Sequence, residues 1–265
     1  MQRRTFVKTT SALVPLALFG PGLAIPQVLD INDAINKAGR QRMLSQRVAK
    51  SYMAIGQKIQ GDSADKILSA SMALFDRQLV ELKAFSPTPE IKTIYGSLEG
   101  AWSDYKTALV GVSPGKAGAE QVIASSGKVL ALANQGTVQL ESFSGKAVGK
   151  LVNIAGRQRM LSQRMAAFYL SASWGVQAAQ SATEMAKARD EFLSAHEVLK
   201  SAPEATAAIK AELALAETQF AFFEAALKTL QPSRPNAQAQ TNVFTTSERI
   251  LQVMDGVTGM YSKLV

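Results

Sequence analysis

The sequence predicts an all-α protein built from two tandem antiparallel four-helix bundles. Three observations lead to this fold class. Glycine and proline are few, 18 and 9 among 265 residues, while alanine, glutamine, serine and leucine are plentiful, which favours helix. Apolar residues recur at steps of three and four, and no alternating strand pattern competes with them. A 17-residue segment occurs twice, which indicates a duplicated helical unit.

The composition excludes several classes of protein. Hydrophobic residues make up 47% of the chain and charged residues 19%, as in a globular protein. Cysteine is absent and His196 is the single histidine, so disulfide scaffolds, thiolate metal sites and sites with two histidine ligands are excluded. No nucleotide-binding or hydrolase motif is present. We therefore expect no enzyme, no metal and no cofactor, and we place His196 on a helix surface.

Residues 1–24 have the pattern of a signal peptide. The pair Arg3-Arg4 precedes a short apolar stretch and a small-residue cleavage site, as in twin-arginine export signals. Pro15 and Pro21 disfavour the alternative, an uncleaved anchor. Removing three basic residues and no acidic residue from a net charge of +8 leaves +5, with no dense basic run. We expect a periplasmic protein, soluble after cleavage, that binds no nucleic acid.

The duplicated segment spans residues 36–52 and 153–169. At an offset of 117 residues, 13 of 17 positions are identical, and ten of these are consecutive. Weaker matches continue the repeat: Phe75 with Phe192, Leu82 with Leu199, Trp102 with Phe220, Tyr105 with Phe223, and Ser126 with Ser247. These matches predict two homologous domains, 25–143 and 144–265.

Each unit is expected to contain four helices. In the first unit we place them at about 27–59, at 62–85, from Pro89 to before Ser113, and from after Gly115 to about 143. Thr88 is the expected N-cap of the third helix, because proline is favoured at the first helical position after a capping residue.

In the second unit Ser181 and Glu184 have the spacing of a capping box for the second helix. The segment around Pro203 marks the start of the third helix, and residues 231–240 form a linker before the last. Residues 142–150 join the units. They form either a tight turn, which places the units side by side, or part of one long helix, which places them end to end.

Two arginines lie where each first helix should be apolar. Arg42 and Arg159 share a helical stripe with apolar and small residues, and neither copy of the 17-residue segment contains an acidic residue. A buried guanidinium needs a negative partner. That partner must be a carboxylate from another helix or a small anion, and planar oxyanions match the guanidinium fork.

The motif AGRQRMLSQR resembles that of the type IV pili methyl-accepting chemotaxis transducer N-terminal (PilJ-type) domain. It is also similar to the periplasmic P-box helix of nitrate/nitrite sensor histidine kinases, in which two copies of the domain hold the anion between their first helices. The resemblance implies a sensory bundle. Matched by motif position, the implied ligand-binding residues are Arg42, Arg159, Gly39, Gly156 and Lys37, with Ser45, Gln46, Ser162 and Gln163 as weaker candidates. Ile154 replaces the lysine in the second unit.

We therefore expect a periplasmic sensor module for a small inorganic anion, with nitrate or nitrite favoured by the resemblance. No membrane helix or kinase follows residue 265, so we expect a membrane sensor, transporter or reductase as partner. The binding unit is either a monomer with an internal pseudo-dimer or a homodimer. The alternative function is a helical interaction module without a small ligand. Carboxylates paired with both Arg42 and Arg159 would favour that alternative.

Overall fold

A computed structural model describes residues 27–111 and 113–264, and within these ranges it contains eight helices and no strand. In chain order they are α1 (Ile31–Gly56), α2 (Gly61–Phe85), α3 (Pro89–Val110), α4 (Lys116–Ser144), α5 (Ala147–Trp174), α6 (Ala178–Ser201), α7 (Ala207–Leu227) and α8 (Ala237–Ser262). The all-α prediction is confirmed. The predicted signal peptide, 1–24, lies outside the described residues.

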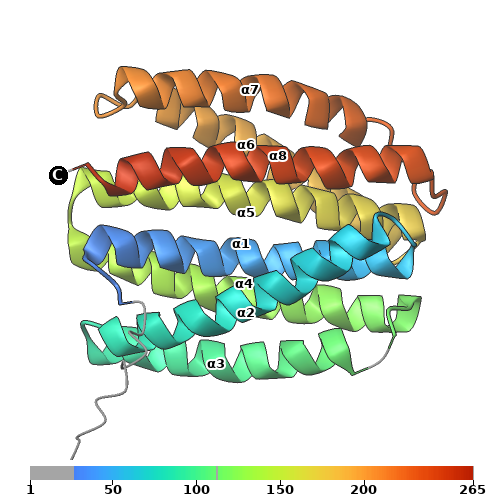
Figure 1. Ribbon diagram of the computed structural model, residues 1–265, viewed down its shortest axis with the longest axis horizontal. Coiled ribbons are helices and arrows are strands. Elements are labelled where there is room, and N and C mark those ends of the chain that lie inside the picture. The colour runs from blue at the N-terminus through green and yellow to red at the C-terminus, as the bar shows by residue number, and fades with distance from the viewer. Residues whose placement is uncertain (1–26, 112, 265) are drawn as a thin grey trace, which may run out of the picture.

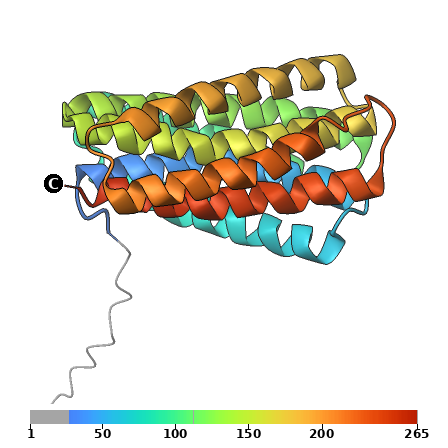
Figure 2. The ribbon, with the colours of Figure 1, turned by 90° about the horizontal axis from the view of Figure 1, so that it is seen from above.

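The helices of each half form a four-helix bundle, and the two bundles pack side by side (Figure 1). Helix α1 contacts α2 and α4 in the first bundle, and α5 contacts α6 and α8 in the second. The most extensive contact joins α1 to α5, which lie in the middle of the molecule, while α3 and α7 lie at its outer edges. Seen from above, all helices follow roughly one axis (Figure 2).

A tight turn joins the two bundles. Helix α4 ends at Ser144, Gly145 follows in the left-handed conformation with φ of 62°, and α5 begins at Ala147. Glycine adopts this backbone conformation without steric cost, which ends the helix and reverses the chain. The side-by-side arrangement is therefore correct and the end-to-end alternative is wrong.

Helices α1 and α5 run parallel through the centre. Near their starts, a Cβ built on Gly149 would lie 3.1 Å from Cδ1 of Ile35. Near their ends, the Gln57 side chain donates to the carbonyl oxygen of Leu170 at 3.0 Å. The two copies of the motif are thus in register along neighbouring helices of one chain.

Several helix starts agree with the sequence. The Thr88 hydroxyl accepts from the Ile91 amide at 3.3 Å, and Pro89 is the first residue of α3, as predicted. Asp30, Thr206 and Asn236 cap α1, α7 and α8 in the same manner. Each side chain satisfies one of the backbone amides that a helix start leaves without a partner.

The expected capping box of the second unit is wrong. Helix α6 begins at Ala178, so Ser181 already lies inside it, and its hydroxyl donates to the Val176 carbonyl oxygen at 3.3 Å. The Glu184 carboxylate instead pairs with Arg164. Pro203 also lies before the true start of α7, which Thr206 caps, because the chain makes a further turn after the proline.

The two units repeat their internal hydrogen bonds. Gln41 donates to the carbonyl oxygen of Phe75 at 3.2 Å, and Gln158 donates to that of Phe192 at 2.9 Å. The aromatic pairs follow the repeat as well, since Phe75 stacks on Trp102 with centroids 3.9 Å apart and Phe192 stacks on Phe220 at 4.4 Å. The weak matches in the sequence therefore mark equivalent packing positions.

One hydrophobic core runs through both bundles and takes residues from all eight helices. His196 is buried beside this core, contrary to the surface position predicted: it is 4% exposed and lies parallel to the Phe192 ring. The reason is helical spacing, since it follows Phe192 by one turn on the buried face of α6. None of the described helices is both long enough and apolar enough to cross a membrane.

Candidate functional site

The repeated motif lies where α1 and α5 approach most closely. A Cβ built on Gly39 would fall 3.6 Å from the Cα of Gly156, and one built on Gly156 would fall 3.7 Å from the Cα of Gly39. Both Cβ positions lie 3.2 to 3.6 Å from Nη2 of Arg42 and of Arg159. The missing side chains thus allow the two helices and both guanidinium groups to converge on one point.

Each of these arginines reaches into the other unit. Arg42 Nη2 donates to the carbonyl oxygen of Asn153 on α5 at 3.1 Å, and Arg159 Nη2 donates to that of Asn36 on α1 at 3.0 Å. Both arginines are 0% exposed. The hypothesis that they face each other within one chain agrees with this geometry, and no second chain is needed to bring them together.

The outer ends of the two guanidinium groups meet different acceptors. Arg42 Nη1 donates to the amide oxygen of Asn134 on α4 at 2.9 Å. Arg159 Nη1 forms an ion pair with Asp255 on α8. Asn134 and Asp255 stand eight residues after Ser126 and Ser247, so they occupy equivalent positions in the two units. One arginine therefore has a carboxylate partner and the other has an amide.

A second arginine joins each acceptor from the opposite unit. Arg157 Nη1 donates to the Asn134 oxygen at 3.3 Å, and Arg40 Nη2 donates to Asp255 Oδ1 at 2.9 Å. Arg157 is also paired with Glu191 of α6. We call Arg42, Arg157 and Asn134 the amide cluster, and Arg159, Arg40 and Asp255 the carboxylate cluster. Neither cluster is complete without residues from both units.

Burial and neighbouring charge act on both central arginines. Burial, reinforced by the positive charges of Arg157 and Arg159, lowers the pKa of Arg42 to about 9. Burial and Arg40 lower the pKa of Arg159 to about 10, and the attraction of Asp255 opposes them. Since a guanidinium keeps its proton in proteins, these shifts indicate buried positive charge that is incompletely compensated. The Nε atoms of both arginines are buried without a hydrogen-bond partner among the described residues.

The weaker candidates form hydrogen bonds within and between helices. The Ser45 and Ser162 hydroxyls donate to carbonyl oxygens of their own helices, at 2.7 and 2.8 Å. The Gln46 amide donates to the carbonyl oxygen of Ser126 at 3.3 Å, and the Gln163 amide to that of Ser247 at 3.0 Å. The two glutamines therefore hold α1 against α4 and α5 against α8, whereas the two serines bond within their own helices.

Lys37 contacts a different set of residues from those in the two arginine clusters. Its ammonium group lies 2.8 Å from Glu81 and 3.1 Å from Asp33, and it donates to the carbonyl oxygen of Gln27. These carboxylates compensate its charge. Among the residues implied by the resemblance, the structure therefore brings together the two arginines and the two glycines.

Sequence reasoning did not identify the acceptors, Asn134 and Asp255. A signal for them was present, because extending the match of Ser126 with Ser247 by eight residues aligns the two. The flanking arginines Arg40 and Arg157 come two residues before Arg42 and Arg159, on roughly the opposite helix face, yet their long side chains reach the same acceptors.

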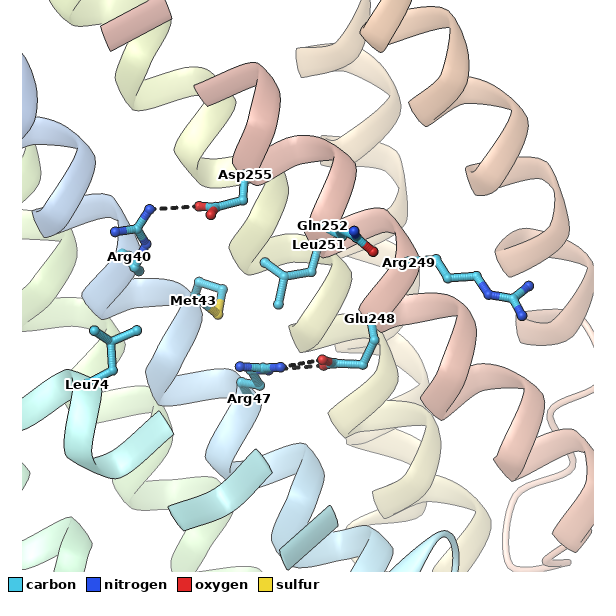
Figure 3. Close-up of a pocket in the computed structure, with 9 residues that line it drawn as sticks. All are labelled: Arg40, Met43, Arg47, Leu74, Glu248, Arg249, Leu251, Gln252 and Asp255. Carbon is cyan, nitrogen blue, oxygen red and sulfur yellow. Dashed lines mark hydrogen bonds and ion pairs between the residues drawn. The ribbon is translucent and has the colours of Figure 1, made fainter. Parts of the chain in front are cut away.

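A groove of about 400 Å³ lies beside the carboxylate cluster, between α1 and α8 (Figure 3). Two ion pairs cross it, Arg40 with Asp255 and Arg47 with Glu248, and Met43 lies between them. Lys50, which is fully buried, also pairs with Glu248. These contacts join the first helix of one unit to the last helix of the other.

Arg157 and Arg164, the equivalents of Arg40 and Arg47, have their ion-pair partners within the second unit. Arg157 pairs with Glu191 and Arg164 with Glu184, both on α6. At the positions of α4 that match Glu248 and Asp255, the first unit carries Gly127 and Asn134. The two outer contacts between the units, α1 with α8 and α4 with α5, therefore differ in charge. Helix α8 carries carboxylates at its contact with α1, whereas α4 carries neutral residues at the matching positions.

The sequence profile of one protein family, described as "Type IV pili methyl-accepting chemotaxis transducer N-term", matches residues 26–137 and 141–244. The chain belongs to this family. Its two PilJ-type matches fall on the two four-helix units, so the predicted tandem repeat is confirmed. Neither a comparison with curated proteins nor one with solved structures gave a match.

The second PilJ-type match ends inside α8. It stops at residue 244, whereas α8 continues to Ser262 and carries Glu248 and Asp255. The carboxylates that pair with Arg40, Arg47 and Arg159 thus lie beyond the matched region.

Proposed function

We propose that this PilJ-type protein is an exported sensory module that binds a small oxyanion between its two units and acts through a membrane partner. Membership of a family described as the N-terminal part of a chemotaxis transducer supports a signalling role without catalysis. Export to the periplasm rests on the twin-arginine pattern of residues 1–24. The partner is a membrane sensor, a transporter or a reductase.

The surroundings of Arg42 carry the anion proposal. This fully buried guanidinium donates to two neutral oxygens, those of Asn134 and Asn153, and forms no ion pair with any residue that the structure describes. The carboxylates of Glu141 and Glu191 favour its charge from nearby, but neither accepts a hydrogen bond from it. Buried charges in proteins are normally paired, so an external anion is the natural source of the missing negative charge.

Nitrate and nitrite have the properties that this site requires. Both are planar and singly charged, and their oxygens accept two parallel N–H bonds from one guanidinium. The resemblance to the P-box of nitrate/nitrite sensors favours the same ligands. An anion held near Gly39 and Gly156 would contact both units at once, so its binding free energy would favour one arrangement of α1 against α5. A partner protein would then detect the bound anion through the arrangement of α1 against α5.

Thermal unfolding of the mature protein tests the proposal. Nitrate, nitrite, chloride and sulfate are compared at equal ionic strength, with Arg42→Ala as the site variant. A ligand at about 100 times its Kd stabilises the folded state by about 2.7 kcal/mol, which raises the midpoint measurably. We expect this rise with nitrate or nitrite, not with chloride, and not in the folded Arg42→Ala protein. Arg249→Ala, which removes an exposed charge of α8, is the control and should keep the response.

The alternative function, a helical interaction module without a small ligand, predicts the opposite result in thermal unfolding. If the arginine clusters serve only assembly, no anion raises the midpoint, and Arg42→Ala changes the oligomeric state or the binding of a protein partner. Circular dichroism of each variant confirms that it is folded, so that a lost response is not mistaken for a lost fold.

A further inference from the structure

We infer that the two arginine clusters differ in function. In the carboxylate cluster Asp255 supplies the negative charge from within the chain, whereas the amide cluster alone binds an external, singly charged planar oxyanion. Each chain would then bind one anion, at Arg42, Arg157 and Asn134. This inference rests on the proposed function and specifies where in the paired site the ligand binds and which charge it carries.

The duplication supplies the first argument. In one unit Asp255 Oδ1 accepts from Arg159 Nη1 and Arg40 Nη2, and in the other Asn134 Oδ1 accepts from Arg42 and Arg157. The same two-arginine arrangement is therefore built twice around one oxygen. In the carboxylate cluster a planar group with one negative charge occupies the position that both arginines share, so each of them has a charged acceptor. The amide of Asn134 reproduces the oxygen without the charge.

The charges around each cluster supply the second argument. The positive charge of Arg157 is already paired with Glu191, so Arg42 is the member of the amide cluster that has no ion pair. A monovalent anion would match the one missing charge. A divalent anion such as sulfate would add a second negative charge close to Glu191 and Glu141, which already act on Arg42.

The exposure of the clusters supplies the third argument. Arg42 is fully buried, but Asn134 is half-buried, and the side chains of Arg157 and Glu191 are 37% and 39% exposed. The amide cluster therefore extends from the buried guanidinium to the surface. The unpartnered Nε of Arg42 offers a further donor inside the site. Arg157 and Asn134 therefore mark the side of the cluster from which an anion would reach Arg42.

The test exchanges the two acceptors in the full mature chain, with nitrate and formate as planar monovalent probes and sulfate as the divalent control. Asn134→Asp gives the amide cluster its own carboxylate, so nitrate affinity should fall by more than about tenfold. Asp255→Asn opens the second cluster, so a second nitrate response should appear. The exchanged protein, Asn134→Asp with Asp255→Asn, should respond to nitrate again, and this response should depend on Arg159 in place of Arg42.

The outcomes separate this inference from the proposed function. If wild type binds nitrate and Asn134→Asp binds it equally well, the inference is overturned while the anion-sensing function stands. The same holds if sulfate binds as well as nitrate. If neither wild type nor Asp255→Asn responds to any anion, the proposed function falls, and the inference falls with it. A response in Asp255→Asn but not in wild type would also overturn both, because it would show that the amide cluster is closed.

Discussion

Gly39 of α1 lies directly against Gly156 of α5, so that a Cβ built on either would fall 3.6 to 3.7 Å from the Cα of the other. Glycine disfavours a helix by about 1 kcal/mol relative to alanine, and each of these residues lies well inside a long helix. The absence of a side chain at both positions allows the two units to approach closely at the level of Arg42 and Arg159. Contact between the units and convergence of the guanidinium groups therefore have the same structural cause.

Alanine at Gly39 or Gly156 should weaken anion binding with little change in stability. The added Cβ would lie 3.2 to 3.6 Å from Nη2 of Arg42 and Arg159, so the flexible ends of these side chains must shift. The loss of favourable contacts is offset by the better helix propensity of alanine, about 1 kcal/mol. Nitrate titrations and urea unfolding of both variants measure the two effects.

Gly100→Ala is the matched control for those variants. Gly100 lies in α3, and a Cβ built there meets no atom within 4 Å. This change should stabilise the protein by about 0.5–1 kcal/mol and leave nitrate affinity unaltered. If Gly39→Ala behaves in the same way on both measurements, the glycine contact has no part in binding.

The two central arginines should differ in what they contribute to stability. Without anion, Arg42→Met removes a buried charge that has no ion pair, and such replacements are often neutral or stabilising. Arg159→Met removes a partner of Asp255, whose side chain is 44% exposed, so the lost pair is worth about 1 kcal/mol at most. Urea unfolding in anion-free buffer should therefore find Arg159→Met the less stable protein. The reverse order would show that Arg42 is already compensated within the chain.

The fold and half of the candidate site could be predicted from the sequence. Helical spacing placed Arg42 and Arg159 on the inward stripe of their helices, and both are buried there. The duplication gave their pairing within one chain as one of two alternatives, and the glycine at 145 allowed the turn that brings the units together. The helical stripe and the turn are local features, since each depends on residues within a few turns of one helix.

The acceptors and several helix ends could not be predicted in the same way. Asn134 lies 92 residues after Arg42, and Asp255 lies 96 residues after Arg159, so only the packed bundle shows that they meet. The spacing of Ser181 and Glu184 resembled a cap, but the interaction of Glu184 with Arg164 on another helix determines its position. Contacts between helices decide such details, and a periodic pattern does not contain them.

Lys50 and Glu248 form a buried pair whose two partners should be unequally replaceable. Lys50 is fully buried, so Glu248→Gln removes the opposite charge and leaves the ammonium group with neutral partners: the new amide oxygen, the Ser247 hydroxyl and the face of Phe244. Breaking a buried pair in this way costs about 3 kcal/mol. Adding Lys50→Met should recover most of that loss, because the charge is removed as well. Ala167 occupies the equivalent position of the second unit, so the fold tolerates an apolar residue there.

A double-mutant cycle in urea measures the coupling between Lys50 and Glu248. The exposed pair of Lys200 and Glu217, with side chains 37% and 57% exposed, is the control and should show much weaker coupling. Coupling of the buried pair no larger than that of the control would contradict the prediction.

Acid should destabilise the protein through Glu248. Burial opposes ionisation of this carboxyl, but the charges of Lys50 and Arg47 outweigh it and lower its pKa from 4.5 to about 2. Because the pKa in the folded state is the lower one, the unfolded state binds the proton first. The stabilisation is complete above pH 4.5 and is lost as the pH falls toward 2.

The size of this acid effect follows from the shift in pKa. At about 1.4 kcal/mol per unit, it amounts to at most about 3.5 kcal/mol, with some reduction because the Glu248 side chain is 23% exposed. Unfolding free energies measured from pH 6 to pH 2 should therefore decline more steeply in wild type than in the double variant Lys50→Met with Glu248→Gln, which has no titrating carboxyl at this position. Parallel profiles for the two proteins would show that Glu248 titrates normally and that the ion pairs between α1 and α8 contribute little to holding the units together.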